Sequence, residues 1–538
     1  MTPSSSEPSR PDAPRAGATG PMNRQQKEIL SVLLIAAFMS LLAVSSVNVV
    51  LHAIETSLRA STSALQWVVS GYALVFGILL VAAGRAGDVL GRGRLFVAGL
   101  VVFGTGSLLS GLAPSLLALN LARLLMGVGS GLLSPQVTGM IQQYFAGERR
   151  GRAFGMFGGM VGVSVAVGPV MSGALVGALG PEAGWRASFL VNVPVAIIGA
   201  IVALRVLPAS AWAPSSATLP GAGGPSAAGA GTGAGAGASV GARRPRADFD
   251  PVGMALLGLA TLLVMLPFVE SSDSPVGAWI WASLGIGLAL AAGWLVWERR
   301  YAMRGRRPMV HLGLFRTRSF AVGTLLIGAY FTAVAGIWLI IAQYVQQGLG
   351  SSALAAGLVG LPSALAGAVG APIAGRYVLR MGRSMVLVGL ALIIASLLTT
   401  MLVVRLHTTS GLPFWWAGLT LFLQGAGQAM VVSPNQTLTL AEVPLHYAGA
   451  AGGILQTSQR IGTSVGIAAI TGIAFSTAGR RGWDDGFLMG LGASVAICLI
   501  AVALAALDLR GFGGSDRPPS GYDLVTLAQD IAAVVRSL

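Results

Sequence analysis

Apolar residues gather in fourteen long stretches between residues 30 and 508, and each stretch is long enough to cross a bilayer as a helix. Short connections, many of them rich in arginine, separate the stretches. A membrane satisfies backbone polar groups only within helices or closed barrels, so this pattern predicts an all-α integral membrane protein. The predicted spans cover residues 30–52, 65–84, 94–113, 115–137, 153–178, 188–206, 251–270, 277–297, 320–345, 354–376, 384–405, 412–433, 450–476 and 485–507.

The basic residues are sorted by side. With alternating spans and both termini on one face, that face receives 28 of the 34 Lys+Arg residues, and Arg123 alone lies inside a span. The positive-inside rule therefore places both termini in the cytoplasm. The opposite face receives five arginines: Arg59, Arg186, Arg405, Arg480 and Arg481.

Composition indicates the same class of protein. With 54% apolar and 10% charged residues, the chain has too few polar groups to cover a soluble surface, so the bilayer must act as its solvent. The net charge of +15 lies mainly in loops that meet anionic lipid headgroups, and no nucleic-acid partner is expected. Cys498 is the only cysteine, which excludes an intramolecular disulfide. No metal or cofactor is expected.

The connections divide the chain into parts. The first apolar stretch is too long for a signal peptide, so we expect it to be the first span. Residues 298–319 form a basic cytoplasmic loop that we expect to lie against the inner leaflet. The predicted parts are a disordered cytoplasmic tail (1–29), an amino-terminal six-helix half (30–206), a flexible Gly/Ala-rich cytoplasmic linker (207–250), two inserted helices (251–297), the basic loop, a carboxyl-terminal six-helix half (320–507) and a cytoplasmic tail (508–538).

The two halves contain a degenerate internal repeat. The stretch from Gly84 to Arg94 follows the second span, and the stretch from Gly375 to Arg383 follows the tenth with the same spacing of Gly, Gly and Arg. Leu379 stands where the first copy has Asp88. Repeated halves of this kind are typical of secondary transporters.

Five short motifs follow one another along the chain. They are Gly84-x3-Asp88-x2-Gly91-Arg92-x-Arg94, Arg123-x3-Gly127-x-Gly129, Ser164-x3-Gly168-Pro169-x2-Ser172-Gly173, Gly184-Trp185-Arg186-x2-Phe189-Leu190-x-Asn192-Val193-Pro194 and Phe315-Arg316-x-Arg318-Ser319-Phe320. The motifs resemble those of the major facilitator superfamily, and the last two resemble segments of its fourteen-span drug:proton antiporter branch. This resemblance covers residues 30 to 508 and implies a fold of fourteen transmembrane helices, two halves latched on the cytoplasmic side, and export of small amphipathic compounds against inward proton flow.

Some of these residues have a simpler interpretation. Gly127, Gly129, Gly168 and Gly173 can serve close helix packing alone, and Pro169 can simply kink its span. A kink beside packed glycines would also let the helix flex between two arrangements, as alternating access requires. The loop from Gly84 to Arg94 can be a solvated turn, although charge bias alone gives no reason for its acid.

The first span departs from the antiporter pattern. That branch usually carries an Asp, an Asn and a Pro there, whereas this chain has Ala43 at the acid position and His52 at the proline position. None of the 19 Asp+Glu residues falls in a predicted hydrocarbon interior. His52 and Glu55 share a helix face, and imidazole titrates near neutral pH, so this pair is the first candidate for proton coupling. Two solvated residues at the membrane edge are the alternative.

Arg123 is the main ionisable group expected near the cavity. A buried arginine is costly unless it is paired or hydrated, so it should face the bundle interior and bond Asn48, Ser45 or backbone carbonyls. It is a third proton-coupling candidate, and a helix clamp without a role in transport is the alternative. Met126, one turn away, is a candidate cavity residue together with Asn48 and Ser45.

The carboxyl-terminal half supplies amides and aromatic rings. Amides bond a ligand without the cost of a buried charge, and aromatic side chains add apolar surface, although packing is their commoner role. Gln459 and Arg460 lie at the start of the thirteenth span. The cavity candidates are Tyr330, Phe331, Trp338, Gln343, Gln428, Asn435 and Gln456.

A secondary active exporter is the function that the resemblance implies. A facilitator, uptake permease or lipid transporter of the same fold is the alternative, because the acid of span one is missing. Lys27 is the only lysine, so a phosphate-binding loop is impossible, and no zinc-protease motif occurs, so we expect no enzyme. Arg123 without interior acids favours neutral or anionic substrates. Arginine outnumbers lysine 33 to one, which suggests a bacterial plasma membrane, and we expect a monomer.

Overall fold

A computed structural model describes residues 20–59, 62–214, 250–270, 278–306 and 308–509. Most of the predicted linker and both predicted tails, apart from their inner ends, lie outside the described residues. Within these ranges all regular secondary structure is helical. This agrees with the predicted all-α class.

The amino-terminal half contains six long helices and one short one. They are α1 (Arg24–Leu58), α2 (Thr62–Leu90), α3 (Arg92–Gly111), α4 (Leu116–Tyr144), α5 (Gly147–Leu190), α6 (Asn192–Val206) and the short α7 (Ala209–Trp212). α5 is interrupted at Gly180, whose φ of 80° is not helical and which precedes Pro181. Its residues therefore form two helical segments.

α1 begins earlier than the predicted boundary at residue 30. Asn23 caps it by accepting a bond from the Gln26 N–H, and the Gln26 side chain returns a bond to the Asn23 N–H. This capping box starts the helix at Arg24, so the prediction of a disordered tail extending to residue 29 is wrong at its inner end. Polar residues open the helix before its apolar run begins.

Two further helices, α8 (Pro251–Glu270) and α9 (Ala278–Met303), follow the undescribed linker. α9 continues past the predicted end at residue 297, and a 3-10 helix, η2 (Leu312–Arg316), occupies the connection to the next half. The predicted basic loop at 298–319 is therefore partly helical at its start and contains this helical turn. Charged residues such as Arg299 and Arg300 extend α9 into the region expected for lipid headgroups.

The carboxyl-terminal half contains the remaining helices. They are α10 (Arg318–Gln343), the π-helical η3 (Tyr344–Gly348), α11 (Ala353–Met381), α12 (Arg383–Ser410), α13 (Trp416–Thr439), the 3-10 helix η4 (Leu445–Tyr447), α14 (Ala448–Arg481) and α15 (Trp483–Leu509).

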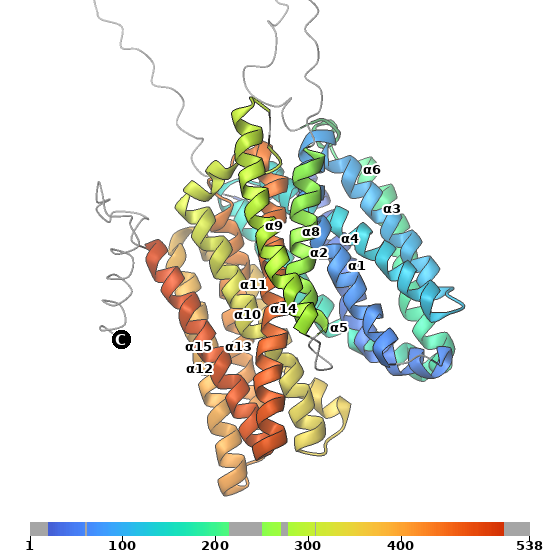
Figure 1. Cartoon of the computed structure of the whole chain (residues 1–538), viewed down its shortest axis with the longest axis vertical. Helices are drawn as coiled ribbons and strands as arrows, with labels where there is room; N and C mark the ends of the chain where they lie inside the picture. The colour runs from blue at the N-terminus through green and yellow to red at the C-terminus, as the bar shows by residue number, and fades with distance from the viewer. Residues whose placement is uncertain (1–19, 60–61, 215–249, 271–277, 307, 510–538) are drawn as a thin grey trace, which may run out of the picture.

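The helices form two bundles, and α8 and α9 lie across their junction (Figure 1). In the first bundle α1 packs on α5, and α4 packs on α2 and α3; in the second α10 packs on α14, and α13 packs on α11 and α12. The bundles meet where α5 contacts α11 and where α2 contacts α14. α8 contacts α9, α2 and α14.

Twelve ranges of the described chain are long and apolar enough to cross a membrane. One of them, Gly147–Val206, has 60 residues and includes the break at Gly180. α13 is not among the twelve, because Gln424, Gln428 and Asn435 lower its hydropathy. The all-helical membrane fold is confirmed, while the count of fourteen spans stays a prediction.

Candidate functional site

Asp88, at the end of α2, joins the two bundles at one end of the molecule. Its carboxylate accepts bonds from the backbone N–H groups of Gly449 and Ala450, both at 3.1 Å, at the start of α14. A helix amino terminus presents free N–H groups and a positive dipole end, so it is a favourable partner for a buried carboxylate. Gly84 packs directly on Gly449, where a side chain at either position would collide with the other helix.

Arg92 completes this contact, which we call the latch (Asp88, Arg92 and residues 445–450). Its Nη2 lies 2.8 Å from Asp88 Oδ1 and donates to the Leu445 carbonyl at 2.6 Å. Gly91, with a φ of 104°, turns the chain between α2 and α3 and packs against α7. Arg94 of the same motif is exposed. The solvated-turn interpretation is therefore wrong for Asp88 and Arg92, which are 3% and 1% exposed.

A second close approach lies between α5 and α11. Gly151 packs on the Gly375 backbone, and Gly155 packs on the Ala371 carbonyl. Gly375 begins the second copy of the internal repeat. Both junctions between the bundles are thus tight beside the repeated motifs.

Arg123 of α4 lies inside the amino-terminal bundle and is 1% exposed. Its Nε donates to the Val68 carbonyl at 2.8 Å, and its Cζ lies 4.4 Å from the centroid of the Tyr72 ring. The predicted inward orientation and backbone partner are confirmed. Met126, one turn along the helix, is fully buried, with its sulfur 4.0 Å from Arg123 Nη1.

Tyr72 also anchors a cluster of hydroxyl groups. Its Oη lies 2.6 Å from Ser130 Oγ, which lies 2.8 Å from Ser40 Oγ. These side chains bring α1, α2 and α4 together in the interior of the bundle. The sequence interpretation missed this cluster, since single serines and tyrosines in apolar spans carry no distinguishing pattern.

The other amino-terminal candidates occupy separate places. His52 Nδ1 lies 3.6 Å from Glu55 Oε2, and their side chains are 86% and 43% exposed. The predicted pair therefore forms, on the exposed outer part of α1. Ser45 donates to the Ser164 carbonyl at 2.9 Å and so joins α1 to α5. The structure describes the backbone of Asn48 as helical but not its side chain.

The motif glycines pack helices within the same bundle. Gly168 lies against Ser45 and Gly127 against the Tyr72 backbone, so a side chain at either position would collide. Gly173 has more room, with Val49 as the neighbour of a side chain added there. Pro169 lies inside α5 without a break at that point. These contacts support the packing role and leave the flexing role as a prediction.

Among the carboxyl-terminal candidates, Gln456 bridges the two bundles. Its Nε2 donates to Thr138 Oγ1 of α4 at 3.0 Å, and its Oε1 accepts a bond from Ser134. Asn435 instead lies within its own bundle, where it accepts a bond from Arg383 and donates to the Gly323 carbonyl. Gln428 on α13 is half-buried.

The aromatic candidates on α10 differ in exposure. Tyr330 is 1% exposed and packs edge-on against Phe331, whereas Trp338 is 37% exposed. A buried aromatic side chain of this kind stabilises the bundle by apolar burial. Of the three, Phe331 and Trp338 remain candidates for contact with a ligand.

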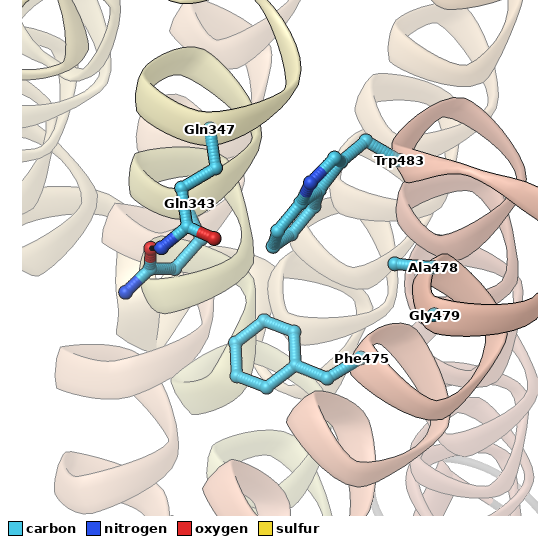
Figure 2. A pocket seen from close by; sticks show the side chains of 6 residues that line it. All are labelled: Gln343, Gln347, Phe475, Ala478, Gly479 and Trp483. Atoms are coloured by element: carbon cyan, nitrogen blue, oxygen red, sulfur yellow. Dashed lines mark hydrogen bonds between the residues drawn. The ribbon is translucent and has the colours of Figure 1, made fainter.

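Gln343 lines a cavity of about 350 Å³ between α10 and the junction of α14 with α15. Gln343 and Gln347 form one wall, and Phe475 and Trp483 form the facing wall (Figure 2). Gln347 donates to Gln343 at 2.6 Å, and the two aromatic rings lie 5.9 Å apart. The cavity therefore combines amide and aromatic surfaces near one end of the carboxyl-terminal bundle.

Two acids at α8 and α9 are buried, contrary to their predicted positions in solvated connections. Asp250 and Glu298 are both 0% exposed. Trp297 Nε1 donates to Asp250 at 2.9 Å, and Trp294 Nε1 donates to Glu298 at 3.0 Å. These acids lie at helix ends, so the predicted lack of acids along the middle of the spans is unaffected.

The prediction that Arg123 alone lies inside a span is wrong. Arg460 stands on α14, which begins at Ala448, so it is about three turns into the helix. Its Cζ lies 4.3 Å from the centroid of the Phe76 ring on α2. The molecule therefore holds a second interior guanidinium, contributed by the other bundle.

Two helical bundles joined by buried polar contacts define a multi-pass membrane protein of the transporter type. A sequence model of the Major Facilitator Superfamily matches residues 33–467, and the chain belongs to this superfamily. Its helices include about twelve to fourteen candidate spans. Membership of this family indicates a transporter rather than an enzyme.

Relatives place the chain near antibiotic and multidrug transporters. It is 31% identical to the probable actinorhodin transporter of Streptomyces coelicolor, over 88% of this chain and 77% of that protein. It is 29% identical to the multidrug resistance protein Stp of Mycobacterium tuberculosis, over 84% of this chain and 76% of that protein. The resemblance to drug exporters is thereby confirmed, and both relatives are bacterial.

A solved structure shows the same fold. The proton:xylose symporter XylE aligns with a TM-score of 0.59 and 15% identity, over 88% of this chain and 94% of that one. At this identity the similarity concerns the fold alone.

Proposed function

We propose that this protein is a secondary active transporter of fourteen spans that exports small amphipathic compounds by alternating access. The observation that carries the proposal is the latch, where Asp88 of one half binds the amino terminus of α14 in the other. A contact between two rigid bundles at one end is what a rocking mechanism must break and remake. The similarity to drug-resistance proteins supports the export direction.

The fourteen-span count rests on two steps beyond the twelve apolar ranges. The 60-residue range, Gly147–Val206, supplies two crossings, because a continuous helix of that length would be about 90 Å long, three times the bilayer core. α13, with 24 residues, supplies one more. Both termini then lie on the cytoplasmic side of a bacterial plasma membrane, as does the latch, and the structure corresponds to the state closed to the cytoplasm.

Export should be tested in a strain that lacks its own exporters. Expression of the protein should raise the tolerated concentration of several amphipathic compounds, and inside-out vesicles should accumulate the same compounds. We expect neutral and anionic compounds to be preferred, because the interior arginines, Arg123 and Arg460, repel lipophilic cations. Strong transport of quaternary ammonium dyes with neutral and acidic compounds ignored would contradict this preference.

Proton antiport is the proposed source of energy, with His52, Glu55 and Arg123 as the coupling candidates. The test is substrate flux under an imposed pH gradient in the wild type and in His52→Ala and Glu55→Gln variants. If the pair carries protons, both variants should lose most of the gradient dependence while downhill flux persists. Full gradient dependence in both variants would remove the pair from the mechanism, even if antiport itself stands.

A facilitator, uptake permease or lipid transporter of the same fold is the second candidate. Ala43, at the position where the antiporter branch usually carries an acid, is 1% exposed and packed in the apolar core of α1. A transporter without coupling would carry substrate only down its own gradient. Flux that ignores both the pH gradient and the membrane potential would favour this candidate. We propose that the working unit is a monomer in either case.

A further inference from the structure

Arg460 belongs to the carboxyl-terminal half, and its side chain extends toward the amino-terminal half. It lies roughly 18 Å along α14 from Ala448, well within the span. Gln456, one turn earlier and on the same helix face, bonds Thr138 and Ser134 of α4. Arg460 therefore faces the other bundle and not the lipid.

The partner of Arg460 on that side is an aromatic ring. The Phe76 ring lies beneath its guanidinium, and the centroid of that ring is 6.0 Å from the centroid of the Tyr72 ring. Tyr72 in turn contacts the Arg123 guanidinium at 4.4 Å. Two cations, one from each half, thus lie over neighbouring rings of α2.

The two guanidinium groups differ in how they are satisfied. Arg123 is 1% exposed and donates to a backbone carbonyl. Arg460 is half-buried, and within the described part of the chain its guanidinium makes neither a hydrogen bond nor an ion pair. A guanidinium has five N–H donors. Electrostatic contact with the face of an aromatic ring gives none of these donors a hydrogen-bond acceptor.

Among the side chains that the structure describes, no acid pairs with Arg460, and the side chain of Glu270 lies outside them. α4 and α14 contain no Asp or Glu, while α2 and α8 contain one each, Asp88 and Glu270, at their ends. Asp88 is already bound by Arg92 and the start of α14. Charged side chains inside a membrane protein normally pair or line a path for a charged solute. The free donors of Arg460 therefore indicate a solute anion.

We propose that Arg460 binds the acidic group of an amphipathic substrate, such as a carboxylate or an ionised phenol. Phe76 holds the guanidinium plane in place from the opposite half, so the anion binds at the junction of the two bundles. Arg460 then contacts the acidic group of the substrate directly, whereas Arg123 donates to the Val68 carbonyl within its own bundle. This assignment rests on the proposed transport function and names the substrate class and the residue that recognises it.

The test compares two dyes that differ only in charge. A carboxylated fluorescent dye and its uncharged methyl ester are titrated onto the purified full-length protein, with anisotropy as the signal. In Arg460→Gln, Kd for the carboxylate should rise about tenfold or more, while Kd for the ester should change by less than about twofold. Arg460→Lys keeps the charge without the planar fork, so it should give an intermediate Kd for the carboxylate.

Arg405→Gln is the matched control, because it removes the same charge from an exposed position on α12. It should leave both Kd values unchanged. An unaltered carboxylate Kd in Arg460→Gln, or an equal loss for both dyes in a folded variant, would overturn the proposal. If Arg460→Gln does not fold, the proposal is tested with Arg460→Lys instead. An unchanged Kd for the carboxylated dye in Arg460→Lys would contradict recognition of the acidic group by the planar guanidinium.

Transport assays distinguish a failure of this inference from a failure of the proposed function. Wild-type protein in proteoliposomes that moves neither dye nor any other amphiphile would contradict transport itself. Wild-type transport of both dyes, with the carboxylate flux unaffected in Arg460→Gln, would contradict only the role of Arg460. Selective loss of carboxylate flux supports both.

Discussion

At the residue scale, the two interior arginines predict different responses to substitution. Arg123 bonds the Val68 carbonyl and lies over Tyr72, so Arg123→Gln should lower the free energy of unfolding by about 2 kcal/mol. Thermal unfolding in detergent, followed by size-exclusion chromatography, measures this loss. Arg94→Gln, at an exposed position beside the latch, should change stability by less than about 0.5 kcal/mol. Equal stability of the two variants would contradict the clamp role of Arg123.

The same residues show how far sequence reasoning reaches. Arg123 lies within the long apolar stretch at 115–137, so its burial was predictable from local pattern. Arg460 lies ten residues inside the predicted span 450–476, yet it was grouped with Gln456 and Gln459 at the opening of that span. Its contact with Phe76, far away in the chain, was not predictable from local pattern. The burial of Asp250 likewise depends on the Trp297 indole, far away in the chain, whereas Trp294 and Glu298 are four residues apart on one helix.

At the element scale, the Trp297 indole joins α9 to the start of α8 by donating to Asp250. The Asp250 carboxylate is buried, and Trp297→Phe keeps an aromatic ring but removes the Nε1 donor, which leaves Asp250 Oδ1 with the Gly253 N–H as its remaining donor. This change should cost about 1–3 kcal/mol. Thermal unfolding together with limited proteolysis near residue 250 measures the effect. Trp415→Phe is the control, because Trp415 is 58% exposed. If Trp297→Phe resists unfolding and proteolysis as well as Trp415→Phe does, the bond between Trp297 and Asp250 does not hold α8 and α9 together.

Element existence was more predictable than element limits. Each long apolar stretch became a helix, because backbone polar groups inside a bilayer have few alternatives. The limits moved where polar residues continued a helix beyond its apolar part, as at the Asn23 cap and in the extension of α9 to Met303. The cavity at Gln343 could not be predicted, since its facing wall comes from Phe475 and Trp483 of later helices.

At the scale of the whole molecule, the latch should set the balance between the two proposed states. An Asp88→Asn side chain cannot pair with Arg92 as an ion or accept from both Gly449 and Ala450 as a carboxylate does. A loss of about 1–2 kcal/mol from the closed state would raise the population of the alternative state roughly fivefold to thirtyfold. We therefore expect the cytoplasmic ends of the bundles to separate and the opposite ends to approach.

Spin-label distances can measure that change. Leu117 and Ser410 are exposed at the ends of the two bundles away from the latch, so a cysteine at each position can carry a spin label. Cys498 is the only native cysteine, so replacing it by serine leaves these two as the labelling sites. Asp88→Asn should add or enlarge a short-distance population between labels at these two positions. Glu148→Gln is the control, because it removes an acid that pairs with Arg152 at 3.4 Å within one helix and does not join the bundles. If both variants leave the distance distribution unchanged, the latch does not govern the equilibrium, and the rigid-body rocking inferred from it must be driven by contacts elsewhere along α5 and α11.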